Sequence, residues 1–155
     1  MDITALVRAI EARSDDDAFA IRLDSTDWQQ LATILERREL SAGELLLRRG
    51  DTEECAYVVE RGRLQVFVIG GPPRSHRIAT LSEGTLIGEP GLFATAPRMA
   101  HVEAMTSCVV WALGSRQLRA MAAEAPLIVL EVMRAAGALM AARMRANLER
   151  GIPVT

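Results

Sequence analysis

Residues 86–104 place one acidic and one basic side chain, Glu89 and Arg98, on what the residue pattern indicates is a single looped element. An apolar pair runs into Gly88-Glu89, a short helical turn follows, and Pro97-Arg98 leads into a second apolar run. The guanidinium of Arg98 suits phosphate oxygens, and a helix start near Gly88 offers free backbone N–H groups. The Glu89 carboxylate would repel phosphate but would accept hydrogen bonds from a sugar hydroxyl. The two requirements together describe a phosphorylated ribose.

The same stretch carries a family resemblance. The pattern is Gly-Glu, a short run, and then Pro-Arg-x-Ala-x-Val-x-Ala, and its second part reads here Pro97-Arg98-Met99-Ala100-His101-Val102-Glu103-Ala104. It resembles the phosphate-binding cassette of cyclic-nucleotide-binding domains, as in catabolite activators and the regulatory subunits of cyclic-AMP-dependent kinase. The resemblance extends from about Ser41 to the C-terminus.

The resemblance implies a set of ligand-binding residues, with Arg98 on the phosphate and Glu89 on the ribose hydroxyl. The full set is Gly88, Glu89, Gly91, Leu92, Pro97, Arg98, Met99, Ala100 and His101. On the C-terminal helix, the positions where this family approaches the base are Arg143, Met144 and Asn147.

Three departures from the family pattern concern the pocket. Pro90 removes an N–H that could face phosphate, Met99 is bulky beside the arginine, and His101 stands where kinase-type domains often have Thr or Ser. Cyclic AMP, cyclic GMP and cyclic dinucleotides such as cyclic di-GMP therefore all remain open as ligands. A relative that has lost its ligand and serves as a protein interaction module is the alternative.

Composition narrows the class of protein. The chain has 155 residues, half of them hydrophobic, which suits one globular domain with a substantial core. A net charge of −2 argues against direct DNA binding, because phosphate neutralisation needs clustered basic charge. The N-terminus does not resemble a signal peptide, and no run of about 18 apolar residues predicts a membrane span. Cys55 and Cys108 lack metal spacing and are expected to be reduced thiols in a cytoplasmic protein.

An enzyme is the competing class, because β-rolls of this shape include metal-dependent cupins. Metal sites of that kind need clustered His and carboxylate ligands, whereas the chain contains only two histidines, His76 and His101. We therefore expect no catalytic residues, no metal and no cofactor beyond the nucleotide ligand.

The elements that would hold the cassette are short strands separated by turn glycines such as Gly43, Gly50, Gly62 and Gly84. Seven strands are predicted, at residues 45–47, 57–59, 64–69, 77–81, 86–87, 101–104 and 109–113. With the resemblance, this predicts a mainly β fold with flanking helices: an eight-stranded antiparallel jelly-roll β-roll, or double-stranded β-helix. Gly71-Pro72-Pro73 predicts an exposed hairpin tip.

Helices are expected on both sides of the β-roll. Residues 1–39 are predicted to form a helical lead-in, with an amphipathic helix at 2–13, a cap cluster at 14–17 and a second helix from Trp28 to about Arg38. The β-roll follows at 40–114, and residues 115–150 form C-terminal helices that act as a lid, the second of them starting at Pro126.

Along that last helix, apolar or small residues recur three and four apart, in a heptad-like seam. They are Leu130, Met133, Gly137, Met140, Met144 and Leu148. Two interpretations stay open: the seam packs on the β-roll, or it pairs with the same helix of a second subunit.

Few residues follow this helix, too few for a helix-turn-helix. The sequence therefore predicts a sensor module that binds a cyclic nucleotide and signals through its C-terminal helix, to a separate protein partner or by forming a homodimer. Met1 favours a complete stand-alone protein over an excised domain.

Overall fold

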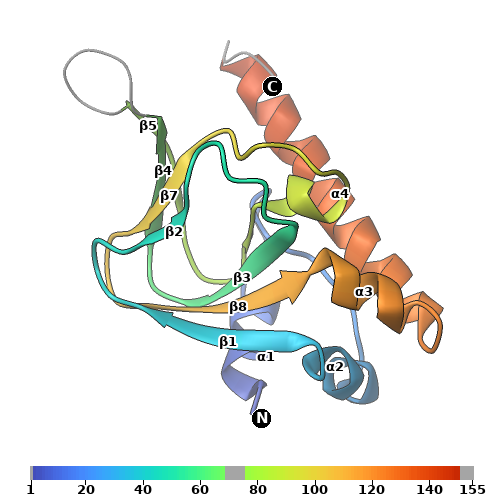
Figure 1. Cartoon of the computed structure of the whole chain (residues 1–155). Helices are drawn as coiled ribbons and strands as arrows, with labels where there is room; N and C mark the ends of the chain where they lie inside the picture. The colour runs from blue at the N-terminus through green and yellow to red at the C-terminus, as the bar shows by residue number, and fades with distance from the viewer. Residues whose placement is uncertain (1, 69–75, 151–155) are drawn as a thin grey trace.

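Eight strands form two antiparallel sheets in the part of the chain that the computed structural model describes, residues 2–68 and 76–150 (Figure 1). One sheet has the strand order β1-β8-β3-β6 and the other β2-β7-β4-β5. The strands are β1 (Leu35–Leu40), β2 (Leu45–Leu47), β3 (Cys55–Arg61), β4 (Leu64–Val68), β5 (His76–Leu81), β6 (Leu86–Ile87), β7 (His101–Ala104) and β8 (Cys108–Gly114). The predicted β-roll with flanking helices is confirmed. The predicted hairpin tip at 71–73 lies outside the described residues.

The side chains of each strand point alternately to the two faces of its sheet, and on β3 the two faces belong to two separate hydrophobic cores. On β3, Tyr57 and Val59 point into the interior of the β-roll, whereas Ala56 and Val58 point outward beneath the helices. All four side chains are buried. The sheet that contains β3 is therefore apolar on both faces, and helices must cover its outer face.

Glycine is required where the strands turn back. Gly62 has a φ of +102°, and a Cβ there would lie 2.5 Å from the backbone oxygen of Ser107. Gly84 has a φ of +85°, and a Cβ would lie 2.5 Å from the backbone oxygen of Ala9 in the first helix. These two turns need both the left-handed backbone and the missing side chain.

Within residues 2–68 and 76–150, four α-helices flank the sheets: α1 (Thr4–Glu11), α2 (Ser25–Ala32), α3 (Ser115–Met121) and α4 (Pro126–Glu149). Helix α1 buries Leu6 and Ile10, two residues of the predicted apolar stripe. The N-cap of α2 is Asp24, whose side chain accepts from the Asp27 backbone N–H at 2.8 Å.

The predicted helix through Arg38 is wrong, because α2 ends at Ala32 and Leu35–Leu40 is strand β1. This strand pairs with β8, with Leu35 opposite Leu113 and Leu40 opposite Cys108. The apolar residues at 31, 34 and 35 imitate a helical stripe. The backbone pairing with β8 overrides that local pattern, as tertiary context often does for short segments.

Helix α4 starts at Pro126 as predicted, but apart from Met133, which packs against the core, the side chains it packs on the domain lie outside the predicted seam. Its buried residues are Ile128, Val132, Ala135, Ala136 and Leu139. Of the seam residues, Leu130, Met144 and Leu148 have exposed fractions of 65%, 47% and 63%. Packing on the β-roll therefore does not account for these three side chains.

Within the described residues, no helix has both the length and the apolar character that a bilayer crossing needs.

Candidate functional site

The predicted helical turn of the cassette is η1 (Glu89–Leu92), a 3-10 turn that follows β6. Gly88 enters it with a φ of +73° and accepts a hydrogen bond from the Gly91 N–H at 3.0 Å. Pro90 has no N–H to offer. Because Pro90 has no N–H and the Gly91 N–H is already bonded, this turn has fewer free backbone donors for an anion than the sequence suggested. A turn of four residues also carries only a small dipole.

Arg98 lies inside the molecule, with only 8% of its surface exposed. Its Nη1 donates to the backbone oxygen of Gly88 at 3.0 Å, and its Nη2 donates to the backbone oxygen of Cys55. A Cβ at Gly88 or Gly91 would lie within 2.9 Å of Nη1, so the two glycines make room for the guanidinium. The backbone N–H of Arg98 donates to Asp51 at 2.7 Å, which holds the segment against the β2–β3 turn.

The positive charge of Arg98 is not neutralised within the described part of the chain. No carboxylate of these residues lies within 4.0 Å of its guanidinium, and both of its acceptors are neutral carbonyls. Its Nε is buried and has no hydrogen-bond partner. A buried cation without a counter-ion carries a desolvation penalty of several kcal/mol. The geometry therefore suits an anion that reaches Nε.

Glu89 is also buried, with 7% of its surface exposed, and it is paired with the C-terminal helix. Its Oε2 accepts from Nη1 of Arg143 on α4 at 2.8 Å. The same Nη1 donates to the backbone oxygen of Leu86 at 2.9 Å, and Nη2 donates to Oγ1 of Thr85 at 2.8 Å. Arg143 thus ties α4 to the cassette.

A second carboxylate, that of Asp17, accepts from Nε of Arg143 at 2.8 Å. Burial lowers the pKa of Arg143, but the Glu89 and Asp17 carboxylates more than offset this and leave the pKa above its ordinary value. The guanidinium is charged throughout the accessible pH range. Arg143 is therefore a permanent cation shared between the cassette and the N-terminal segment.

The other predicted residues lie around this pair in different environments. His101 stacks on Phe67, with ring centroids 5.3 Å apart, and its Nδ1 accepts from the Arg49 backbone N–H at 3.3 Å. Gly91 and Leu92 are buried, Ala100 is half-buried and Pro97 is exposed. Met99, which was expected to narrow the pocket, has 57% of its surface exposed.

Comparison with protein-family models decides the family. The model described as "Cyclic nucleotide-binding domain" matches residues 37–125, more than half of the chain. The chain belongs to the cyclic-nucleotide-binding domain family. Domains of this family are regulatory and non-catalytic.

Three relatives illustrate the similarity of this cyclic-nucleotide-binding domain to known proteins. An NTE family protein of Mycobacterium tuberculosis is 29% identical over 140 residues, which cover 86% of this chain and 23% of that protein. The cAMP-dependent protein kinase regulatory subunit of Blastocladiella emersonii is 32% identical over 104 residues, 67% of this chain and 26% of that protein. The structure of Thermus thermophilus catabolite activator protein superposes with a TM-score of 0.71 at 25% identity, covering 83% of this chain and 59% of that one. The domain thus spans about a quarter of the length of these two sequence relatives.

The structure brings together only part of the predicted site of this cyclic-nucleotide-binding domain. Of the three predicted base-contact residues, Arg143 reaches the cassette, Met144 is exposed, and the Asn147 side chain accepts from Arg150 at 3.2 Å. Sequence reasoning missed Thr85 and Asp17 entirely. The cluster at 14–17 was interpreted as a helix cap, and no local signal linked it to a helix more than a hundred residues away.

Proposed function

We propose that this domain binds a cyclic nucleotide, with Arg98 on the cyclic phosphate and Glu89 on the ribose hydroxyl, and that it signals through α4. The observation that carries the proposal is the buried guanidinium of Arg98, which has no carboxylate partner among the described residues and an unpartnered Nε. A phosphate would supply the missing negative charge and accept from Nε. Membership of the family supports the same assignment.

Cyclic AMP is the first nucleotide to test, because the Blastocladiella emersonii relative is by its name a cAMP-dependent regulatory subunit. Cyclic GMP and cyclic di-GMP stay in the panel, since Met99 and His101 differ from the family pattern beside the base. Arg143, Met144 and Asn147 remain proposed base contacts. Binding to a separate protein without any nucleotide is the second candidate function.

Calorimetric titration of the purified chain with the three nucleotides tests the proposal directly. Adenosine, which has the base and ribose but no phosphate, is the matched control ligand. We expect heat from at least one cyclic nucleotide and none from adenosine at the same concentration. An absence of heat with all three nucleotides would favour the interaction-module alternative.

The proposal that α4 transmits the signal is supported by the ion pair between Glu89 of the cassette and Arg143 of α4. A ligand shifts an equilibrium between two conformations only if its contacts differ between them. The carboxylate expected to receive the ribose is already bonded to Arg143 of α4, so a ribose hydroxyl must share the Glu89 carboxylate with Arg143 and thereby alter that contact. The cassette itself is fixed by backbone hydrogen bonds to the β2–β3 turn and has less freedom to move.

Hydrogen exchange measured with and without the nucleotide that binds should show this transmission. We expect changed protection in residues 127–150 as well as in the cassette, because the Arg143 contact changes when ribose reaches Glu89. Protection that changes only in residues 88–104 would show that the ligand binds without affecting α4.

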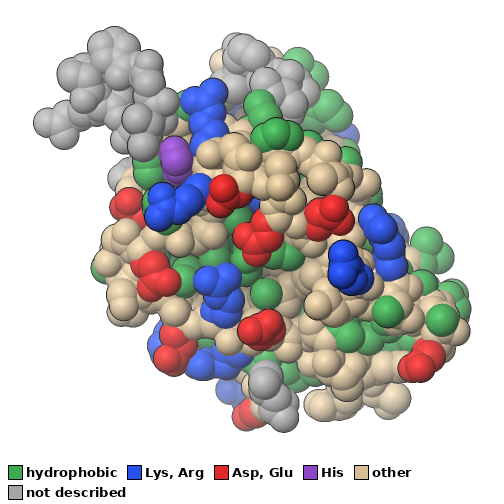
Figure 2. Space-filling model, in the orientation of Figure 1, with side chains coloured by type: hydrophobic (Ala, Val, Ile, Leu, Met, Phe, Trp, Pro, Cys, Tyr) green, Lys and Arg blue, Asp and Glu red, His purple; other side chains and the backbone are tan. Residues whose placement is uncertain are grey.

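The exposed seam of α4 is proposed to pair with a second copy of this chain. Leu130, Met144 and Leu148 are exposed on one face of the helix. Hydrophobic side chains are visible along the right-hand edge of Figure 2, the side on which α4 runs in Figure 1. Elsewhere on the face in Figure 2, acidic and basic side chains are interspersed, in keeping with the net charge of −2.

Sedimentation equilibrium should accordingly give the mass of two chains, and Leu130→Glu should give the mass of one. The introduced carboxylate would be desolvated at the helix pair, whereas on a monomer Leu130 is already exposed to solvent. Ile78 on β5, with 39% of its surface exposed, provides the control variant Ile78→Glu. A single-chain mass for the parent protein would contradict the homodimer and leave a different partner for this face.

A further inference from the structure

Asp17 contacts Arg143 from a part of the chain that the family model does not cover, since that match begins at residue 37. It lies in the segment at residues 12–17 that follows α1. Its Oδ1 accepts from Nε of Arg143 at 2.8 Å, and its backbone oxygen accepts from Oγ1 of Thr85. Thr85 in turn accepts from Nη2 of Arg143. Asp17 thus contacts the Arg143 guanidinium directly at Nε and, through Thr85, indirectly at Nη2.

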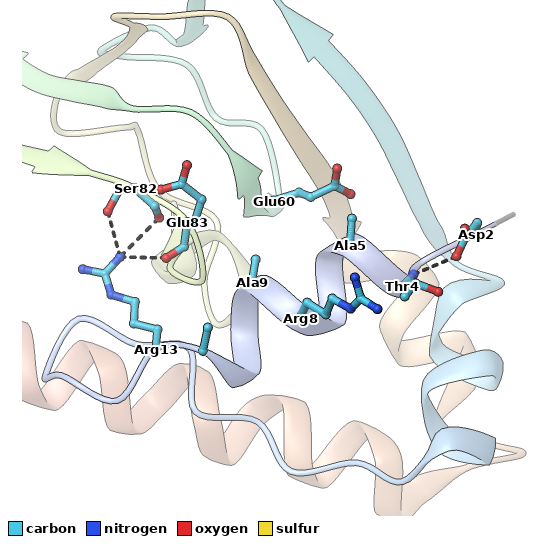
Figure 3. Close-up of a pocket in the computed structure, with 10 residues that line it drawn as sticks. Asp2, Thr4, Ala5, Arg8, Ala9, Arg13, Glu60, Ser82 and Glu83 are labelled. Carbon is cyan, nitrogen blue, oxygen red and sulfur yellow. Dashed lines mark hydrogen bonds between the residues drawn. The ribbon is translucent and has the colours of Figure 1, made fainter.

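The segment is anchored near its start by Arg13, which follows the C-cap of α1. The Nη1 of Arg13 donates to the backbone oxygens of Ser82 and Glu83 at 3.2 and 3.0 Å, as Figure 3 shows. Its Nε donates to Asp15 at 2.7 Å, and its Nη2 lies 3.7 Å from Oδ2 of Asp17. Arg13 is also one of the residues that line the pocket beside α1 drawn in Figure 3.

Opposite charges therefore alternate from the cassette to the end of α1. The order is Glu89, Arg143, Asp17, Arg13 and Asp15. Over the first three residues the exposed fraction of the side chain rises from 9% at Glu89 to 24% at Arg143 and 28% at Asp17, and Arg13 and Asp15 follow with 18% and 60%. Glu89 is the least exposed side chain of the series, so solvent screens the Glu89–Arg143 ion pair least. Removing one partner should therefore cost the most stability in this pair.

We propose that Asp17 is a positioning residue of the nucleotide site: it orients the Arg143 guanidinium against Glu89 and so couples the cassette to α1 as well as to α4. A guanidinium is planar, so holding Nε fixes the direction in which both terminal nitrogens donate. Without the Asp17 carboxylate the guanidinium keeps its contacts with Leu86 and Thr85 but loses the one at Nε, so its plane is less restrained and Glu89 has a less rigid partner. The effect on nucleotide affinity rests on the proposed function, whereas the effect on α4 does not.

The variant Asp17→Asn tests this with little change of shape, and Asp16→Asn is the matched control, because Asp16 is exposed and its neighbours are the same. Hydrogen exchange is measured on the nucleotide-free proteins after thermal melts establish that each variant is folded. We expect roughly threefold or faster exchange of α4 amides around Arg143 and of residues 85–89 in Asp17→Asn, and parent-like exchange in Asp16→Asn. Parent-like exchange in both variants would overturn the proposal.

Arg143→Lys is the second variant, which keeps the charge but cannot donate to both carboxylates from one planar group. It should reproduce the faster exchange around 85–89, and a parent-like result would again contradict the positioning role. This arm needs no nucleotide, so it stays decisive even if the proposed function fails.

The affinity arm uses cyclic AMP or whichever nucleotide in the panel binds. Asp17→Asn should weaken binding by roughly two- to tenfold, because the Asp17 contact is partly exposed and acts only through preorganisation. In an Arg143→Gln background the same substitution should have no further effect, because Asp17 acts through Arg143. Equal losses in the two backgrounds would show that Asp17 influences binding by another route.

Discussion

Arg98→Gln is expected to weaken cyclic-nucleotide binding by roughly ten- to more than a hundredfold. The loss corresponds to about 1.5 to 3 kcal/mol for one charge-assisted hydrogen bond, and burial of the group places the result toward the upper end. Calorimetric titration of the variant measures it. Arg48→Gln is the control, because Arg48 is an exposed arginine beside the same β2–β3 turn.

A stability measurement separates a ligand role for Arg98 from a structural one. If the guanidinium served the fold, its removal would lower the melting temperature of the nucleotide-free protein by several degrees. Because it is a buried charge without a carboxylate partner among the described residues, Arg98→Gln should instead leave that melting temperature unchanged or raise it. Unchanged nucleotide affinity in the folded variant would refute the phosphate assignment.

Arg143→Gln should have the opposite signature, a large loss of stability before any nucleotide is added. The substitution leaves the buried carboxylate of Glu89 without its cation and removes contacts to Leu86, Thr85 and Asp17. Breaking a fully buried pair costs about 3 to 5 kcal/mol, and the 24% exposure of the Arg143 side chain reduces this to roughly 1 to 3 kcal/mol. The melting temperature should fall by roughly 2 to 10 °C.

A second substitution identifies the unpaired carboxylate as the cause. Adding Glu89→Gln to Arg143→Gln removes the uncompensated charge, so the double variant should be more stable than Arg143→Gln alone. Arg145→Gln, on an exposed position of the same helix, provides the control and should melt within about a degree of the parent. A double variant that melts below Arg143→Gln would show that the Glu89 pair is not the source of the loss.

Local pattern was sufficient to predict most of the strands and the cassette, and the family resemblance added the β-roll arrangement. Gly62 and Gly84 mark turns that only glycine can make, and the apolar runs between turns have the length and alternation of strands. The Gly-Glu and Pro-Arg spacing placed Glu89 and Arg98 on one loop, and in the fold both side chains are buried within it. These features depend on residues close together in the chain, so their physical causes are visible in a short window of sequence.

The tertiary structure alone decided which residues complete the site. The apolar residues at 31, 34 and 35 imitate a helical stripe, yet residues 35–40 pair with β8 because a strand gains its hydrogen bonds from a distant partner. Glu89 and Arg143 are 54 residues apart, and Arg143 and Asp17 are 126 apart, so no periodicity connects them. The sequence by itself determined seven of the eight described strands, the turns and the two charged groups of the cassette. Packing of α4 across the domain decided that Glu89 is paired while Arg98 has no carboxylate partner in the described chain, because long-range ion pairing depends on how the elements meet in space.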